Sequence, residues 1–289
     1  MHRRRSFAVR LVAALASVAA AVAATSPAAA QDLVWKVPPQ SAPVVITNAT
    51  IMPVTGPPIE NGILIAEAGV IRYVGPSADA PPTPENATVV DARQRRLYPG
   101  LVAANTIMGL IEIESIRATR DEDEVGDVTP EARAIIAVNP DSTIIPVTRS
   151  NGVLTACTMP LGGLVPGRAA VLRLEGWTWE EMAIDPDAAL CLNWPNLRPV
   201  QAWWMTDSPQ QQMDEAARQL RAIAELFDAA EAYAAARAAD PDTPVDVRHE
   251  AMLPAIRGES QIFIRANELD QIRSAATFTP ATRAPTSPI

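Results

Sequence analysis

The chain has 289 residues, of which 48% are hydrophobic and 20% are charged, and its formal net charge at pH 7 is -9. A surface that binds nucleic acid or anionic lipid needs clustered cations, so this composition argues against both as partners. Only two histidines and one lysine occur, which leaves few side chains for a transition-metal site or a general base.

The first thirty residues have the pattern of a secretory signal peptide. A basic start precedes an Ala/Val/Leu run, and the small residues before Gln31 form an A-x-A cleavage site. The apolar run is short for a membrane span, and nothing later in the chain approaches about 18 consecutive apolar residues. We therefore expect residues 1–30 to be removed, leaving a periplasmic or secreted protein with no membrane association.

A linker and a small β domain are predicted next. Residues 31–43 are Pro-rich from residue 37 onward and form the linker. Residues 44–98 consist of short β-rich runs, with Asn61-Gly62 and Ala68-Gly69 as the turn signals between strands. This pattern predicts strands joined in hairpins.

After Gly100 the hydropathy pattern changes, and the apolar runs become longer. These runs are "LVAANTIMGLIEI", "GVLTACTMP", "AAVLRLEGW" and "QIFIRAN". Continuous apolar runs are typical of strands that are buried on both faces in a parallel sheet. Strands that alternate with helices after a β domain indicate an α/β architecture.

The clearest predicted helix spans residues 209–239. Ser208 can cap it together with Gln211, Pro209 suits its first turn, and Asp240-Pro241 ends it. Helical spacing predicts a buried face made of Met213, Ala217, Leu220, Ala224, Phe227 and Tyr233. Residues 278–289 are rich in Thr and Pro, and we expect them to form a disordered tail.

Several segments, taken in order, resemble the amidohydrolase superfamily and in particular its exported, imidazolonepropionase-like branch. "ITNATIMPVTGPPIENGILIAEAGVIRYVG" is similar to the first part of that family's composite β-sandwich. "VVDARQRRLYPGLVAANTIMGL" resembles its D-A-x-G-x-x-x-x-P-G-[LF]-I-D-x-H-x-H motif. "RSNGVLTACTMPLGGLVPGRAAVLRLEGWTWEEM" and, more weakly, "VRHEAMLPAIRGESQIFIRANELDQI" are similar to later family segments.

The resemblance implies a fold and a reaction. It implies that residues 44–98 are part of a composite β-sandwich and that residues 99–277 form a TIM-like (β/α) barrel. A full barrel takes about 250 residues, so this one is expected to be partial, and a partner chain could complete it. Family members hold Zn²⁺ or another divalent metal at the carboxyl ends of the strands and hydrolyse C–N bonds in small amides or peptides.

The metal-binding positions carry other residues in this chain. Alignment on Pro99-Gly100 places Asn105 and Ile107 where the family has its two histidines, and Arg265-Ala266 where it has His-Ala. We therefore expect no metal and no cofactor, and we cannot assign a catalytic residue. A small amide or peptide ligand is expected near the strand ends, around Asn105, Glu112, Arg265 and Asn267.

Three functions stay open at this point. The chain could be a hydrolase with an unrecognised set of metal ligands. It could be a non-catalytic binding or interaction protein, or a truncated product that needs a partner. The single mature histidine, His249, lies in a predicted helix and is expected to be a surface or structural residue, not a metal ligand.

Other groups of residues each allow two interpretations. Cys157 and Cys191 could form a disulfide or remain as two buried thiols. The acidic run 121–127 could bind Ca²⁺, but a solvated loop is favoured because the EF-hand spacing is missing. The glycines of 161–167 favour a tight turn over an anion cradle. Five tryptophans could line a sugar or peptide groove, but they are more often expected to cover the barrel face or its loops; they are residues 177, 179, 194, 203 and 204.

Overall fold

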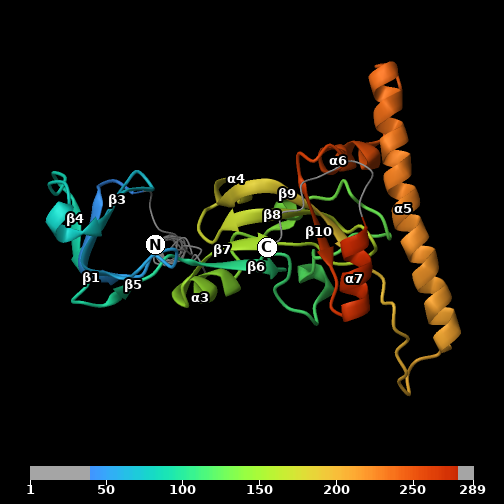
Figure 1. Cartoon of the computed structure of the whole chain (residues 1–289), viewed down its shortest axis with the longest axis horizontal. Helices are drawn as coiled ribbons and strands as arrows, with labels where there is room; N and C mark the ends of the chain where they lie inside the picture. Colours follow the sequence, from blue (N-terminus) through green and yellow to red (C-terminus); the bar gives the residue numbers. More distant parts are fainter. Residues whose placement is uncertain (1–39, 279–289) are drawn as a thin grey trace, which may run out of the picture. The chain divides into compact units, whose positions relative to one another are not determined.

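The computed structural model describes residues 40–278. The predicted signal peptide, most of the predicted linker and all but the first residue of the predicted tail lie outside this range. No helix within the described range combines the length and the apolar composition that crossing a bilayer requires. The elements form two sheets, one before and one after Gly100 (Figure 1).

The first sheet contains five strands in the order β3-β2-β1-β4, with β5 also paired to β1. The strands are β1 (Val44–Ile51), β2 (Ile59–Glu67), β3 (Val70–Pro76), β4 (Thr88–Asp91) and β5 (Arg96–Leu97), and a 3-10 turn η1 (Ser77–Asp79) follows β3. Its small core contains Val45, Ile63 and Ile65. The segment predicted as part of a sandwich is thus a single sheet, in which β4 and β5 run parallel to β1.

The two predicted turn signals have different outcomes. Ala68-Gly69 joins β2 to β3 with φ of 49° and 75°, the two positive values that a tight hairpin turn of type I′ requires. Asn61-Gly62 was wrongly predicted as a turn, because both residues lie inside β2. There Asn61 has φ of 46°, and a Cβ on Gly62 would lie 2.6 Å from Cδ1 of Ile51. The glycine signal therefore marks a bulge and a close contact with β1.

The second sheet is a curled half-barrel with strand order β10-β9-β8-β7-β6 (Figure 1). Its strands are β6 (Leu101–Thr106), β7 (Val153–Thr158), β8 (Gly167–Arg173), β9 (Ala183–Asn193) and β10 (Gln261–Arg265). β6 is parallel to β7, and β10 is parallel to β9. β8 is antiparallel to both of its neighbours, so the predicted parallel arrangement is wrong for the run "AAVLRLEGW". Residues 159–166 between β7 and β8 are too few for a parallel crossover, which needs a dozen or more.

Helices cover one face of the second sheet. The shorter elements are η2 (Arg117–Thr119), α2 (Ala134–Ala137), α3 (Ile144–Ser150) and α4 (Trp179–Met182), and the longer helices are α5 (Pro209–Ala239), α6 (Val247–Ile256) and α7 (Leu269–Thr277). Ile135 of α2 and Ile145 of α3 share a core with Leu172 of β8. A second core joins α5, α6 and α7 to β9. The opposite face of the sheet carries the smaller cluster of Cys157, Ala169 and Cys191.

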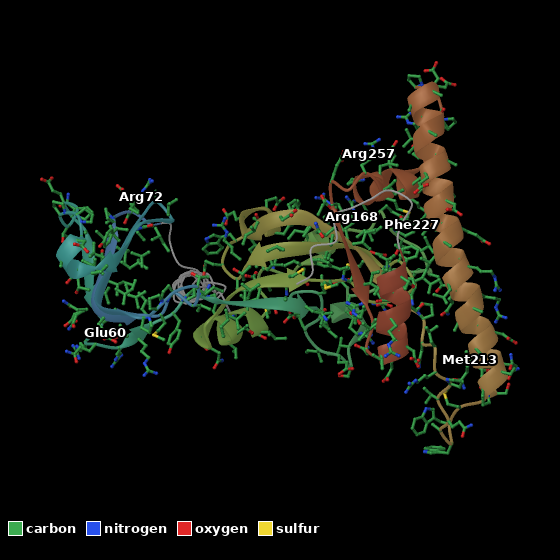
Figure 2. The ribbon with its side chains drawn as sticks, in the orientation of Figure 1. Glu60, Arg72, Arg168, Met213, Phe227 and Arg257 are labelled. Carbon is green, nitrogen blue, oxygen red and sulfur yellow. The ribbon has the colours of Figure 1, made fainter. Side chains whose placement is uncertain are left out.

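Helix α5 has the predicted ends and the predicted capping box between Ser208 and Gln211. Its buried face was predicted only in part. Phe227 is buried and points towards the sheet, but Met213 is 40% exposed (Figure 2). The fully buried positions are Ala216, Ile223, Phe227 and Ala230, while the predicted Ala217 and Ala224 are exposed. Alanines occur on both the buried and the exposed side of α5, so helical periodicity could not show which of them face the core.

Candidate functional site

The carboxyl ends of β7, β9 and β10 lie along one edge of the second sheet, which we call the carboxyl edge. Asn193 and Arg265 are paired residues at the ends of β9 and β10. Because β8 runs in the opposite direction, its first residue, Gly167, lies at the same edge, opposite Cys191. In open α/β sheets this edge is where ligands bind.

Arg265 is held in a network of hydrogen bonds at the carboxyl edge. Its Nη1 donates to Oδ1 of Asn193 over 2.6 Å, and both terminal nitrogens reach the Pro160 carbonyl at 3.4 and 3.5 Å. Nδ2 of Asn193 donates in turn to the carbonyls of Gly162 and Gly163, at 2.8 and 2.9 Å. The guanidinium is therefore fixed between β9, β10 and the loop of residues 159–166.

The glycine loop is a tight turn, as predicted. Gly162 and Gly163 have φ of 79° and 50°, values that favour glycine. A Cβ on Gly163 would lie 2.6 Å from the carbonyl oxygen of Asp127, and one on Gly162 would lie 2.9 Å from the Asp123 Cβ. The glycines thus allow the acidic loop 121–127 to approach the carboxyl edge closely.

The other residues predicted for the site are spread apart. Asn105 is exposed near the end of β6. Glu112 accepts a hydrogen bond from Nδ2 of Asn139 over 3.3 Å. The backbone N–H of Asn267 donates to Oε1 of Gln271 and belongs to the start of α7. Within residues 40–278 no hydrogen bond or ion pair connects any two of the four predicted residues, so the structure does not assemble them into one constellation.

The donor atoms at the carboxyl edge do not fit the metal that the family resemblance implies. Asn105 offers a weakly binding amide, Ile107 offers no donor, and Arg265 is a permanent cation. Across the described part of the chain, no three His, Cys, Asp or Glu side chains gather closely enough to hold a metal ion. No catalytic step through a metal can be derived from these residues.

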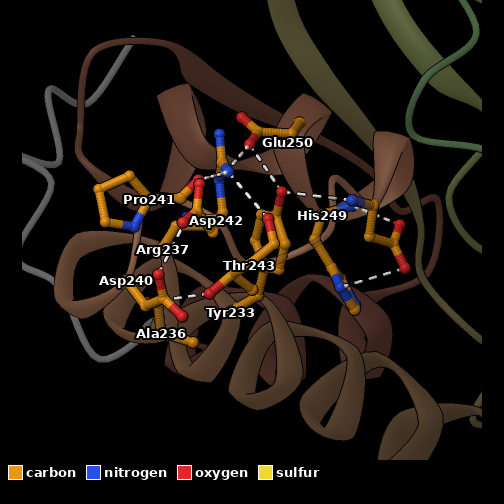
Figure 3. A network of polar contacts seen from close by, with 10 residues as sticks. Tyr233, Ala236, Arg237, Asp240, Pro241, Asp242, Thr243, His249 and Glu250 are labelled. Atoms are coloured by element: carbon orange, nitrogen blue, oxygen red, sulfur yellow. Dashed lines mark hydrogen bonds and ion pairs between the residues drawn. The ribbon is translucent and has the colours of Figure 1, made fainter.

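His249 belongs to a polar network between α5 and α6 (Figure 3). Its backbone N–H is capped by Asp246, and its Nδ1 lies 3.5 Å from Oδ2 of the same residue. Its ring lies 5.4 Å from the ring of Tyr233, whose hydroxyl donates to Glu250 over 2.6 Å. Burial, followed by this hydrogen bond to the Glu250 carboxylate, raises the pKa of Tyr233. As predicted, the histidine is helical, and its contacts hold α6 against α5.

An acidic hollow lies beside the Pro160 loop. It is shallow and opens to solvent, and it is lined by residues 121–124, 132–134 and 137 together with Pro160 and Pro166. Most carboxylates of this run are solvated, as predicted, but Glu122 is only 2% exposed. Its Oε1 accepts from Nε and Nη2 of Arg120, at 2.7 and 2.5 Å. Burial raises the pKa of Glu122, but Arg120 outweighs this effect and holds the pKa below its ordinary value.

The one arginine that lines the hollow is already paired. Arg133 donates from Nε and Nη2 to the two carboxylate oxygens of Asp187, at 2.9 and 2.8 Å. Arg168 reaches the same carboxylate from Nη1, also at 2.9 Å. Burial lowers the pKa of Arg168, and the charge of Asp187 opposes this shift. Asp187 thus neutralises the positive charge of Arg133, and the carboxylates of residues 121–124 give the hollow a negative charge.

The tryptophans do not line a common groove. Trp194 is 7% exposed and packs in the core against Phe278, whereas Trp203 is 92% exposed. Trp203 and Trp204 contact each other edge to face, with ring centroids 5.4 Å apart. Phe278, the first residue of the predicted tail, therefore belongs to the core.

Two features of this region were not predicted from the sequence, namely the role of Asn193 and the burial of Glu122. A signal for Asn193 was present, because this residue directly follows the apolar run of β9 and so lies at the carboxyl edge. No local pattern in the sequence signals the burial of Glu122. Its position depends on a contact between segments far apart in the chain, in which the N–H of Leu161 donates to the Glu122 carbonyl.

Comparison with known proteins relates parts of the chain to amidohydrolases and a deaminase. No family model matches the sequence. The amidohydrolase tasK of Hapsidospora irregularis is 32% identical over 100 residues, which are 34% of this chain and 10% of that protein. The 5-methylthioadenosine/S-adenosylhomocysteine deaminase of Moorella thermoacetica is 36% identical over 63 residues, 22% of this chain and 15% of the deaminase. The match thus spans only a small part of either relative.

A solved structure shares the fold over a longer stretch. The crystal structure of an amidohydrolase from Thermotoga maritima superposes with a TM-score of 0.68 and 21% sequence identity. The superposition covers 81% of this chain and 60% of the Thermotoga maritima chain, and at this level of identity it bears on the fold alone. The chain is therefore similar to amidohydrolases in both local sequence and fold, as its motifs predicted.

Proposed function

We propose that this chain is an exported, amidohydrolase-like binding protein that takes a small amide or peptide at the carboxyl edge without metal-dependent hydrolysis. The observation that carries the proposal is the position of Arg265, whose guanidinium is tied to Asn193 and Pro160. A fixed cation at this edge repels a second cation, because like charges a few ångströms apart destabilise each other.

The competing function is hydrolysis of C–N bonds, which the similarity to amidohydrolases and to a deaminase favours. That reaction needs a metal or a general base, and Asn193 and Arg265, the side chains fixed at the carboxyl edge, supply neither. Fixed hydrogen-bond donors and acceptors, by contrast, are what a binding site for a polar ligand requires. The donor set therefore supports binding over hydrolysis.

Metal analysis of the purified chain tests this proposal. A chain beginning at Gln31 is produced with Zn²⁺ in the growth medium, dialysed, and analysed by mass spectrometry for bound metals. We expect far less than one ion per chain and a thermal unfolding curve that EDTA leaves unchanged. One tightly bound Zn²⁺ per chain, with amide hydrolysis that a chelator abolishes, would overturn the proposal. N-terminal sequencing of the periplasmic fraction tests export and should begin at Gln31.

A second proposal is that a partner chain completes the half-barrel. Leu101 and Val102 of the edge strand β6 are 60% and 62% exposed, and an apolar edge strand is prone to pair with another strand. The Thermotoga maritima fold also extends beyond the part that this chain matches. Light scattering on the purified chain should then show association, and a stable, cooperatively folded monomer would argue against a partner.

A further inference from the structure

We propose that the first sheet pairs face to face with the same sheet of a second copy of this chain, through an apolar face that the described residues leave uncovered. This inference goes beyond ligand binding at the carboxyl edge and does not depend on it. It also concerns a different surface from the edge strand β6.

The two faces of the first sheet differ in how they are covered. On one face Val45, Ile63 and Ile65 are buried, and Tyr73 packs against them. Successive side chains of a strand point to opposite faces, so the residues between these lie on the other side of the sheet. We call that other side the open face.

An apolar row crosses the open face from one edge of the sheet to the other. Val74 of β3 pairs with Leu64 of β2, Leu64 pairs with Ile46 of β1, and Ile46 pairs with Val90 of β4. The two outer members, Val74 and Val90, are 46% and 47% exposed. The pairings place a second row beside the first, which consists of Ile71, Ala66, Val44 and Thr88. Thr88 is the one polar member of the two rows, and no member is charged.

Such a face differs from the solvated side of an ordinary sheet. A sheet with one side in water alternates apolar residues inward with polar residues outward. Here both sides are apolar, because Val89 and Val90 follow each other on β4 and Ile63, Leu64 and Ile65 follow each other on β2. Two rows about 7 Å apart across strands about 4.8 Å apart form a patch of a few hundred Å². Contiguous apolar patches of this size often mark interaction sites.

A second copy is the occupant that fits this face. Two sheets with the same right-handed twist stack with their strands nearly aligned, and the side chains of the facing sides fill the space between them. A second copy supplies a sheet of identical twist and an identical apolar face. A twofold axis along the strands places β3 of one copy over β4 of the other, so Val74 meets the partner's Val90. Leu64 and Ile46 on the central strands meet in the same way.

The charges around the open face permit this contact. The two rows carry no charge, so the twofold contact brings no like charges together at its centre. At the β3 edge, Nε of Arg72 lies 3.8 Å from Oε2 of Glu67, and the two side chains offset each other's charge. The net charge of -9 on each chain opposes association over longer distances, and salt screens this repulsion.

The size of the patch sets the expected strength of the dimer. Stable complexes bury about 800 Å² on each partner, and the open face offers less than that. We therefore expect a weak dimer that dissociates on dilution. Salt should strengthen it, whereas a contact made of ion pairs would weaken as salt rises.

Sedimentation equilibrium of the chain beginning at Gln31 tests the inference. The average mass should rise from that of one copy at about 1 µM towards that of two copies at about 200 µM. Val90→Asp should keep the chain monomeric, because a charge enclosed in an apolar interface loses its water without gaining a partner. Val89→Asp is the matched control. Val89 is adjacent on β4 and 56% exposed, but it pairs with Val45 and so lies on the other face, and this variant should dimerise like the parent chain.

Two further variants complete the test. If Val90→Asp does not fold by thermal unfolding, Val90→Thr keeps a similar shape with an added hydroxyl and should weaken the dimer at least about threefold. Leu101→Asp on β6 should leave the dimer intact, which separates it from pairing at the edge of the half-barrel.

Four results would overturn the inference. They are a chain that stays monomeric at about 200 µM, assembly beyond two copies, a folded Val90 variant that dimerises as strongly as the parent chain, and loss of the dimer in Val89→Asp or Leu101→Asp to the same extent as in the Val90 variant. None of these results bears on the metal analysis, which tests the proposed function separately.

Discussion

Oxidation of the folded chain should leave Cys157 and Cys191 unlinked. The two thiols are free and buried, on β7 and β9, with β8 between them. Their partners on β8 are Val171 and Gly167, so they are also offset along the strand. Two strand spacings alone separate the Cα atoms by about 10 Å. A disulfide needs about 7 Å or less. Of the two interpretations that the sequence allowed, the structure supports buried thiols.

Burial also sets how fast these thiols react. Burial raises the pKa of Cys191 to about 12, from an ordinary value of 9.0, and raises the pKa of Cys157 in the same direction. At pH 8 the ionised fraction of Cys191 then falls from about 1 in 10 to about 1 in 10⁴. Because only the thiolate reacts, native Cys191 should react about a thousandfold more slowly than the unfolded chain.

The raised pKa of Cys191 also determines whether the free energy of unfolding rises or falls with pH. The folded state keeps the thiol protonated at pH values where the unfolded thiol ionises. The associated stabilisation is therefore complete below the unfolded pKa and is lost as pH rises from there towards 12.

The assay is reaction with Ellman's reagent at pH 8, with and without urea, followed by mass spectrometry of diamide-treated chain under non-reducing conditions. Cys157→Ala leaves Cys191 as the single thiol and assigns its rate. A disulfide formed in the folded chain, or a native rate for Cys191 within about tenfold of the unfolded rate, would refute the reasoning.

Two further predictions concern the core and the acidic loop. Phe227→Ala on α5 should lower the free energy of unfolding in urea by about 3–5 kcal/mol, whereas Met213→Ala on the same helix should change it by less than about 0.5 kcal/mol. Equal losses would contradict the observed buried face. The lowered pKa of Glu122 stabilises the fold above the unfolded pKa of a glutamate, and this stabilisation is lost as pH falls through the folded pKa. Glu122→Gln should therefore flatten the loss of stability in acid, and an unchanged acid profile would show that the ion pair with Arg120 contributes nothing measurable.

Local signals in the sequence predicted the ends of elements but not their packing. Ser208, Gln211 and Asp240 define both ends of α5, because capping depends on neighbours a few residues away. Which residues of α5 are buried depends on the strands that the helix packs against. Ala216 and Ala217 are both alanines, so helical periodicity alone cannot tell which of them faces the core. Ile223 decides the matter, since it packs with Leu190 of β9 in the observed core.

The direction of β8 and the partner of Arg265 could not be predicted for the same reason. Both depend on residues far apart in the chain: Asn193 is 72 positions from Arg265. An apolar run predicts burial on both faces, which β8 has, but it carries no information on strand direction. The length of the connection does carry this information: the tight turn predicted at 161–167 leaves only residues 159–166 between β7 and β8, which is too short for a parallel crossover.

The motif at the start of β6 carries two kinds of information that depend on different physical constraints. Gly100 is required by packing, because a Cβ there would lie 2.8 Å from the Cβ of Leu154 on the neighbouring strand β7. That constraint acts in any chain that pairs these strands, whether or not a metal binds. Asn105 and Ile107 are under no such constraint, because a side chain at the strand end can change without disturbing the sheet. Similarity in the Pro99-Gly100 segment therefore predicts the fold. It does not predict the reaction, which depends on the residues present at positions 105 and 107.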